Sequence, residues 1–174
     1  PLAMTAAVDW HGWQPTEHAT LLFVIKDGRM LLIRKKRGLG AGKINGPGGR
    51  VDPGEAPRAA AVREVREELE VTPLGVAAAG ELCFQFLDGY GLHVWVFTAS
   101  DLQGSPAETD EAIPLWVPLS AIPYDSMWPD DAFWFPHMLA GRPFAGRFVF
   151  DGEEMVSHAV EASPGTLGPD FAVA

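Results

Sequence analysis

The sequence predicts a single α+β domain, a sandwich of strands and helices. Short apolar runs rich in β-branched and aromatic residues alternate with turn signals, which is typical of β-strands. Segments with helical features follow some of these runs, at residues 56–71 and 128–140. The chain has 174 residues, enough for one sizeable core. Strands mixed with helices in this order favour a layered α+β or α/β arrangement.

The first strands are expected just after an N-terminal arm. Residues 1–18 lack clear periodicity and form this arm. Residues 20–25 and 30–34 are apolar and β-rich, and Asp27-Gly28 lies between them. Because this dipeptide favours the tight turns that join antiparallel strands, the two runs are predicted to form a hairpin.

The next segment changes from a loop to a helix. Residues 48–55 are rich in glycine and proline, and Pro57 suits the first turn of the helix that follows. Ala61, Val65 and Leu69 recur at four-residue spacing. This spacing predicts a buried apolar stripe along one face of the helix.

The remaining elements follow in order. Further strands are expected at residues 77–86, 92–99, 115–118, 144–150 and 155–160, the last two joined by a turn at Asp151-Gly152. Residues 100–112 are polar and acidic, which predicts a loop. Pro129 and the two aspartates after it suit the first turn of a helix that ends near Ala140. The domain is expected to span residues 19–161, and residues 162–174 to form a poorly ordered tail.

Composition excludes several classes of partner. The formal charge of −10 disfavours non-specific binding to nucleic acid, although a phosphate ligand that brings metal ions remains compatible. A single cysteine, Cys83, excludes an internal disulfide and fits a reducing compartment. No apolar run approaches the ~18 residues of a membrane span, and no signal peptide is recognisable. We therefore expect a cytoplasmic monomer that binds neither membrane nor nucleic acid.

Three glutamates gather on one face of the helix predicted within residues 56–71. Glu64, Glu67 and Glu68 stand at i, i+3 and i+4, so their charges lie close together. Like charges in this arrangement are unfavourable unless something neutralises them, and a hard divalent cation with oxygen ligands is suited to that role. The alternative is a solvated acidic face, as most charge runs are.

A short basic run follows the first predicted hairpin. Lys35, Lys36 and Arg37 are consecutive. They either solubilise the end of a strand or attract the phosphates of an anionic ligand. The sequence does not decide between these alternatives.

The loop and helix together resemble the Nudix box, the signature of the Nudix hydrolases. The matching positions, all at the spacing of the family pattern, are Gly49, Glu55, Arg63, Glu64, Val65, Glu67, Glu68 and Val71. One position departs, because Glu70 replaces the final glycine of the box. The resemblance implies an α/β/α sandwich in which a mixed sheet lies between helices. It also implies hydrolysis of nucleoside diphosphates linked to another group, with Mg²⁺, or Mn²⁺ in its place, as the cofactor.

The same resemblance assigns roles to particular residues. The implied metal ligands are the Gly48 carbonyl, Glu64, Glu67, Glu68 and Glu111. Arg63 is expected to orient the box glutamates, and Glu55 to brace the loop. The implied catalytic set is Glu64, Arg63 and a general base, which is either Glu67 or Glu111.

Similarity to one subfamily extends well beyond the box. The segments that carry it are residues 35–43, 45–46, 103–104, 108–111, 127–131 and 134–136. They resemble the MutT homologues that hydrolyse oxidised purine nucleoside triphosphates, chiefly 8-oxo-dGTP and 2-hydroxy-dATP, over residues 19–160. The resemblance implies hydrolysis to a nucleoside monophosphate and pyrophosphate, which would cleanse the nucleotide pool.

The expected substrate pocket follows from the chemistry of a purine. Trp128 offers an aromatic plane for the base. Asp130 and Asp131 can share a proton, because two adjacent like charges raise one pKa, and can therefore both donate to and accept from a base edge. Their alternative role is helix capping. The other expected substrate-binding residues are Asn45, Phe84 and Trp134, with Lys35, Leu39 and Leu92.

Two rival functions remain open. Leu39, Ile44 and Leu92 differ from the residues of the animal enzymes, so the substrate is alternatively a dinucleotide polyphosphate, ADP-ribose or a nucleotide sugar. A non-catalytic binding module is the third hypothesis, supported only by Glu70. All the box glutamates are present, which argues against it.

Overall fold

A computed structural model describes residues 8–162 of the chain. The strands are β1 (Glu17–Lys26), β2 (Arg29–Lys35), β3 (Ile44–Asn45), β4 (Gly48–Arg50), β5 (Thr72–Leu74), β6 (Ala77–Phe86), β7 (Gly91–Ala99), β8 (Asp101–Gln103), β9 (Ala112–Pro118), β10 (Phe144–Asp151) and β11 (Glu154–Ala162). The helices are α2 (Pro57–Leu69) and α3 (Asp131–Leu139), with short 3₁₀ turns η1 (Trp10–Gly12), η2 (Leu119–Ala121) and η3 (Tyr124–Ser126).

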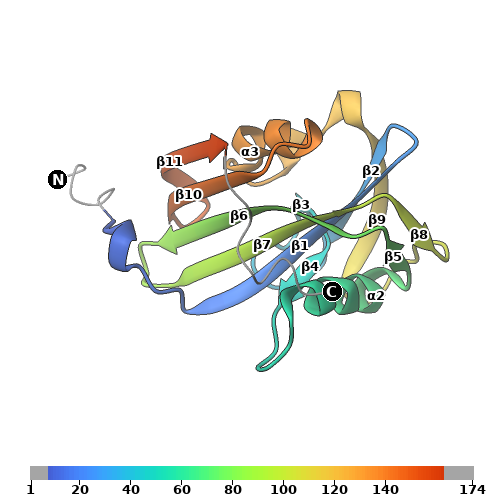
Figure 1. Ribbon diagram of the computed structural model, residues 1–174, viewed down its shortest axis with the longest axis horizontal. Helices are drawn as coiled ribbons and strands as arrows, with labels where there is room; N and C mark the ends of the chain where they lie inside the picture. The colour runs from blue at the N-terminus through green and yellow to red at the C-terminus, as the bar shows by residue number, and fades with distance from the viewer. Residues whose placement is uncertain (1–7, 163–174) are drawn as a thin grey trace.

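Nine of the strands form one mixed sheet. Its main path runs β11-β10-β6-β7-β1-β2-β3, while β4 pairs with β1 and β9 pairs with β2. The β1–β7 and β6–β10 pairs are parallel and the others antiparallel. Helices α2 and α3 lie on opposite sides of this sheet (Figure 1). The predicted α/β/α sandwich is therefore confirmed.

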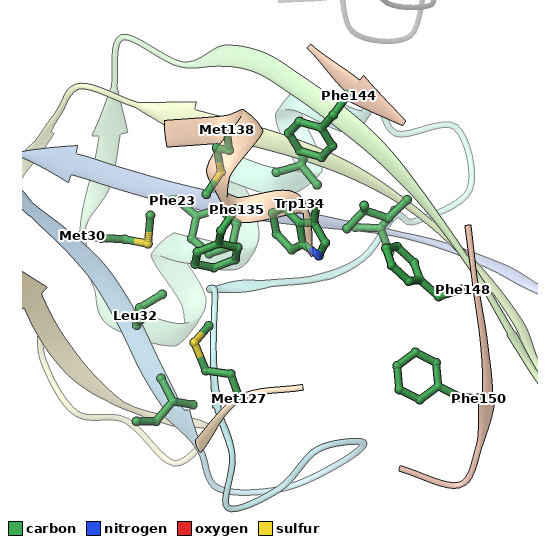
Figure 2. Close-up of a cluster of buried hydrophobic side chains, with 14 of the residues drawn as sticks. Phe23, Met30, Leu32, Met127, Trp134, Phe135, Met138, Phe144, Phe148 and Phe150 are labelled. Carbon is green, nitrogen blue, oxygen red and sulfur yellow. The ribbon is translucent and has the colours of Figure 1, made fainter. Parts of the chain in front are cut away.

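Strand β1 contributes to a separate core on each side of the sheet. Leu22 and Val24 pack in the cluster that includes Val65 of α2. Phe23, between them, points the other way and packs beside Trp134 and Phe135 of α3, as Figure 2 shows. Side chains alternate between the faces of a strand, so a continuous apolar run is what a sheet covered on both faces requires.

The two hairpins predicted from turn dipeptides are confirmed. The β1–β2 hairpin turns at Asp27 and Gly28, both with positive φ, and the β10–β11 hairpin forms at the predicted turn. The predicted loop at residues 100–112 needs correction, because it contains β8, which pairs with β5. Part of the predicted glycine loop is also a strand, β4.

The structure describes the expected start of the domain and almost none of the expected tail. Strand β1 begins at Glu17, inside the expected arm, and Trp13 in the arm donates a hydrogen bond to Gln85 (2.8 Å). The expected flexible tail falls almost wholly outside the described residues. Within residues 8–162, no helix is long and apolar enough to cross a membrane.

Helix α2 ends in a conformation that glycine normally adopts. Glu70, the residue that replaces the box glycine, has φ 59° and ψ 31°, in the left-handed region. Its N–H donates to the Arg66 carbonyl (3.0 Å) and closes the helix. A side chain in this region costs about 1 kcal/mol because its Cβ crowds the backbone. Glu70 therefore departs from the family pattern in residue type, while its backbone has the left-handed conformation that glycine favours.

Replacing Glu70 with glycine should stabilise the protein. We expect Glu70→Gly to raise the free energy of unfolding by about 1 kcal/mol, which corresponds to about 2–4 °C in melting temperature. Thermal unfolding followed by circular dichroism measures this shift. Glu70→Ala is the matched control, since it removes the carboxylate and keeps the Cβ. An equal gain in both variants would show that the charge, and not the backbone, is responsible.

Candidate active site

Arg63 joins the glycine loop to helix α2. Its Nε and Nη2 atoms donate to the two carboxylate oxygens of Glu55, at 2.8 and 2.9 Å. Nη2 also donates to the Arg50 carbonyl (3.0 Å). Glu55 in turn accepts from the Asp52 N–H (3.0 Å), so the loop closes around the guanidinium. The hydrogen bonds from Arg63 lower the pKa of Glu55, which keeps this ion pair charged.

The same guanidinium orients two glutamates of the predicted metal set. Arg63 Nη1 lies 2.9 Å from Glu64 Oε1 and 3.3 Å from Glu67 Oε2. Glu64 is largely buried, whereas half of the Glu67 side chain is exposed. Burial raises the pKa of Glu64, and the Arg63 hydrogen bond opposes this rise. A Cβ at Gly49 would overlap the Glu64 carboxylate, so a side chain at this position would displace that carboxylate from its contact with Arg63.

Glu68 is the most buried carboxylate of the box. Its side chain points beneath the loop, only 3% of the residue is exposed, and Oε1 accepts from the Gly48 N–H (2.9 Å). Burial, with the charges of Glu64 and Glu111 as smaller causes, raises its pKa to about 8. A Cβ at Gly48 would overlap the Thr20 carbonyl, which explains why the chain has glycine where β4 approaches β1.

Glu111 reaches the box from a distant part of the sequence. The Thr109 hydroxyl donates to the Glu68 carbonyl (2.7 Å) and accepts from the Glu111 N–H (3.2 Å), which anchors this segment to the end of α2. The Glu111 charge raises the pKa of both Glu64 and Glu68, so the three carboxylates repel one another. Glu111 itself pairs with Arg37 (3.3 Å).

The four carboxylates have the chemistry of a site for a divalent cation. In this conformation no three His, Cys, Asp or Glu side chains between residues 8 and 162 converge enough to hold an ion, because protein donors hold the carboxylates individually. Buried oxygens whose charges raise one another's pKa nevertheless suit a hard cation, which neutralises them. Glu64 and Glu68 are the buried members of this group, while the side chains of Glu111 and Glu67 are 41% and 52% exposed.

A largely apolar pocket opens beside the box. Of the predicted residues, those that line it are Lys35, Leu39, Asn45, Gly48, Glu68, Phe84, Leu92, Trp128, Asp130 and Asp131. The structure therefore brings residues from seven elements (β2, β3, β4, α2, β6, β7 and α3) and their loops to one cavity. Glu68 and Gly48 lie at the box, and the two aspartates come from the start of α3. One ligand can contact both groups.

Aromatic side chains form part of the pocket wall. Phe86 and Phe150 line it, and both pack edge-on against the Trp128 ring, at 6.4 and 5.5 Å between centroids. Lys43 places its ammonium 5.4 Å from the same ring and pairs with Glu153 (3.2 Å). Sequence reasoning missed the two phenylalanines. The alternation of Phe84 and Phe86 along one strand was the available signal.

The two aspartates are buried side by side. Asp130 is 3% exposed and Asp131 8%. Burial raises the pKa of Asp130 to about 6. Burial also raises the pKa of Asp131, well above the ordinary range, and the charge of Asp130 raises it further. Burial and the proximity of a like charge favour the retention of one proton by the pair, which can then offer both a donor and an acceptor to the pocket.

Trp134 does not line the pocket, which corrects the sequence-based prediction. It is fully buried one helical turn beyond Asp130, between Phe23 and Phe144. Its Nε1–H donates to Asp130 Oδ2 (2.8 Å). Residues four apart share a helix face, so the indole lies behind the carboxylate and supports it. Trp134 fixes the position of Asp130 from within the core.

This architecture is typical of a MutT-type hydrolase: a mixed sheet, a loop and helix held together by Arg63, and an adjoining pocket. The chain belongs to the Nudix family, since residues 15–138 match the NUDIX domain. Members of this family generally use divalent metal ions.

Particular relatives are similar over most of the chain. It is 44% identical to the oxidized purine nucleoside triphosphate hydrolase of Danio rerio over 138 residues, which cover 79% of this chain and 88% of that protein. The Mus musculus protein of the same name is 38% identical, with the same coverage. Among solved structures, a MutT protein from Bacillus halodurans superimposes with a TM-score of 0.76 at 23% identity, covering 85% of this chain and 99% of that one, and shows the shared fold.

The buried aspartate pair makes a pH-dependent contribution to stability. An unfolded aspartate titrates near pH ~3.9. Because the pKa of Asp131 is raised on folding, the native state binds more protons, and stability is lost as the pH rises through the folded pKa. Asp131→Asn removes this loss. The stability of the variant relative to wild type should therefore increase as the pH rises above the ordinary aspartate pKa of ~3.9.

Urea denaturation at several pH values measures this difference. Asp125→Asn is the matched control, because Asp125 is exposed and lies just before the pair. Parallel pH profiles for Asp131→Asn and wild type would contradict the raised pKa of Asp131.

Proposed function

We propose that this protein hydrolyses oxidised purine nucleoside triphosphates to the nucleoside monophosphate and pyrophosphate, with Mg²⁺ as the cofactor. The observation that carries the proposal is the buried Asp130–Asp131 pair in an aromatic pocket that is continuous with the box. The names of the Danio rerio and Mus musculus relatives support the same substrate class.

The pocket suits a purine whose base edge has altered donors and acceptors. Trp128 and the phenylalanines offer aromatic surface for stacking. The protonated member of the aspartate pair donates to the base edge, and its ionised neighbour accepts. Asn45, which also lines the pocket, has both an acceptor and donors. A carbonyl added by oxidation changes the hydrogen-bond pattern of the base, and a buried polar site discriminates strongly against a mismatched pattern.

The triphosphate then extends toward Gly48 and Glu68. Glu64, Glu68 and Glu111 are the residues we assign to Mg²⁺, with the Gly48 carbonyl and Glu67 as further oxygen donors. The ion neutralises phosphate charge and acidifies water when bound. Arg63 holds Glu64 in place through its 2.9 Å contact. Lys35, which lines the same pocket and lowers the pKa of Glu68, adds positive charge near the phosphates.

The proton acceptor is one of two carboxylates. Glu67 is half exposed and paired with Arg63, while Glu111 lies close enough to Glu68 to raise its pKa. The proximity of Glu111 to the buried carboxylates supports it as the base. Glu67 has the solvent access that an attacking water requires. Comparison of the pH–rate profiles of Glu67→Gln and Glu111→Gln separates the two roles.

The substrate class is tested by pyrophosphate release with Mg²⁺ across a nucleotide panel. The panel contains 8-oxo-dGTP, 2-hydroxy-dATP, O6-methyl-dGTP, dGTP and ADP-ribose. We expect kcat/KM for an oxidised purine to exceed that for dGTP by at least tenfold, or about 1.4 kcal/mol of transition-state binding. Equal rates for all triphosphates, or a preference for ADP-ribose, would reject the proposed substrate and retain the Nudix chemistry.

The buried carboxylate of the box is tested by Glu68→Gln. Loss of its charge should lower kcat at least about a hundredfold, the scale seen when one electrostatic contact to a transition state is removed. The fold should be retained, because glutamine still accepts the Gly48 hydrogen bond. Glu70→Gln, on the exposed end of the same segment, is the control and should keep wild-type turnover. Near-normal kcat in Glu68→Gln would remove Glu68 from the metal site.

A further inference from the structure

Two histidines lie side by side on the sheet, outside the pocket and the carboxylate cluster. His18 of β1 is the register partner of His93 in the parallel strand β7. Their Nδ1 atoms are 3.0 Å apart. Because register partners in adjacent strands project from the same face of a sheet, the backbone itself holds the two imidazoles together.

The spacing of the two nitrogens matches that of neighbouring ligands on one metal ion. At a metal–nitrogen bond of about 2.0–2.1 Å, two nitrogens that subtend a right angle are about 2.9 Å apart, and in a tetrahedral site about 3.4 Å. The observed 3.0 Å is close to the right-angle value. Right-angle coordination by nitrogen and oxygen is typical of Cu²⁺ and Ni²⁺, and Cu²⁺ binds such donors most tightly.

The surroundings of the pair hold the rings in place. Trp95 is buried and stacks on His18, with 5.0 Å between centroids and 18° between planes. It also meets the His93 ring edge-on at 4.5 Å. Glu81 Oε1 lies 3.6 Å from His93 Nε2, the nitrogen that faces away from His18. A carboxylate there favours the proton on Nε2, so that Nδ1 of His93 accepts the hydrogen bond from His18 and has a lone pair that a metal ion can take over, as in many metal-ligating histidines.

We propose that His18 and His93 form a two-histidine site for a transition-metal ion, with Cu²⁺ bound most tightly and water completing the coordination. His18 is exposed, which gives the ion access and leaves room for water. Residues 8–162 offer no third His, Cys, Asp or Glu arranged to join the two, so both protein ligands are imidazoles. The chain's charge of −10 attracts cations to its surface. This site does not depend on the proposed hydrolase function.

The test is a titration of the whole protein with Cu²⁺, followed by calorimetry and electron paramagnetic resonance. Excess Mg²⁺ occupies the oxygen-ligand sites of the box. We expect one Cu²⁺ per chain with hyperfine coupling to two imidazole nitrogens. His18→Asn and His93→Gln should each weaken binding at least tenfold and leave coupling to a single nitrogen.

Three variants control this experiment. His158→Asn alters an exposed histidine of β11 and should bind Cu²⁺ as wild type does. Glu68→Gln should also bind normally, which separates this site from the box. Thermal unfolding confirms that the histidine variants are folded. Unchanged binding in His18→Asn and His93→Gln, or coupling to one nitrogen in wild type, would overturn the proposal.

Discussion

The contacts of Arg63 determine how the box is arranged. One planar guanidinium binds both oxygens of Glu55, the Arg50 carbonyl and Glu64. A lysine has a single charged centre and cannot make this fork of parallel hydrogen bonds. The loop and the helix are therefore fixed relative to each other before any ligand arrives. Arg63 also orients Glu64 toward the loop, while Glu68, one turn later, remains on the buried side under Gly48.

Strand β1 connects this arrangement to the substrate pocket. Thr20 and Leu21 pair with Gly49 and Gly48, so the box loop is held against the centre of the sheet. Phe23, further along the strand, lines the pocket and packs on α3. The proposed sites for the base and for the phosphates thus share one strand. Sites supported by sheet strands are held more accurately than sites on loops alone, and in-line attack on a phosphate depends on such positioning.

Short sequence signals predicted the turns and the helix face that depend on neighbouring residues. They could not predict contacts between segments that are distant in sequence. Asp27-Gly28 specifies its own turn, and the spacing within α2 specifies its buried face, because both depend on neighbouring residues. Strand β8 was missed because its partner, β5, is remote in sequence and both strands are short. The burial of Trp134 was missed for a related reason. An aromatic residue one turn after Asp130 can face the pocket or the core, and only the position of Phe144 behind it decides.

The buried carboxylates place opposing demands on stability and binding. Asp130, Asp131 and Glu68 all have raised pKa values, and burial is the main cause in each. Desolvated charges without full compensation destabilise the empty protein. A bound ligand would offset this destabilisation in a different way at each end of the pocket. A purine edge can share the proton of the aspartate pair, which Trp134 supports with a neutral donor. At the box, Glu68 faces other carboxylates, and a bound cation would neutralise their repulsion while the carboxylates stay ionised. Under the proposed function, the same burial that weakens the fold would make one end selective for a base and the other for a metal-bound phosphate.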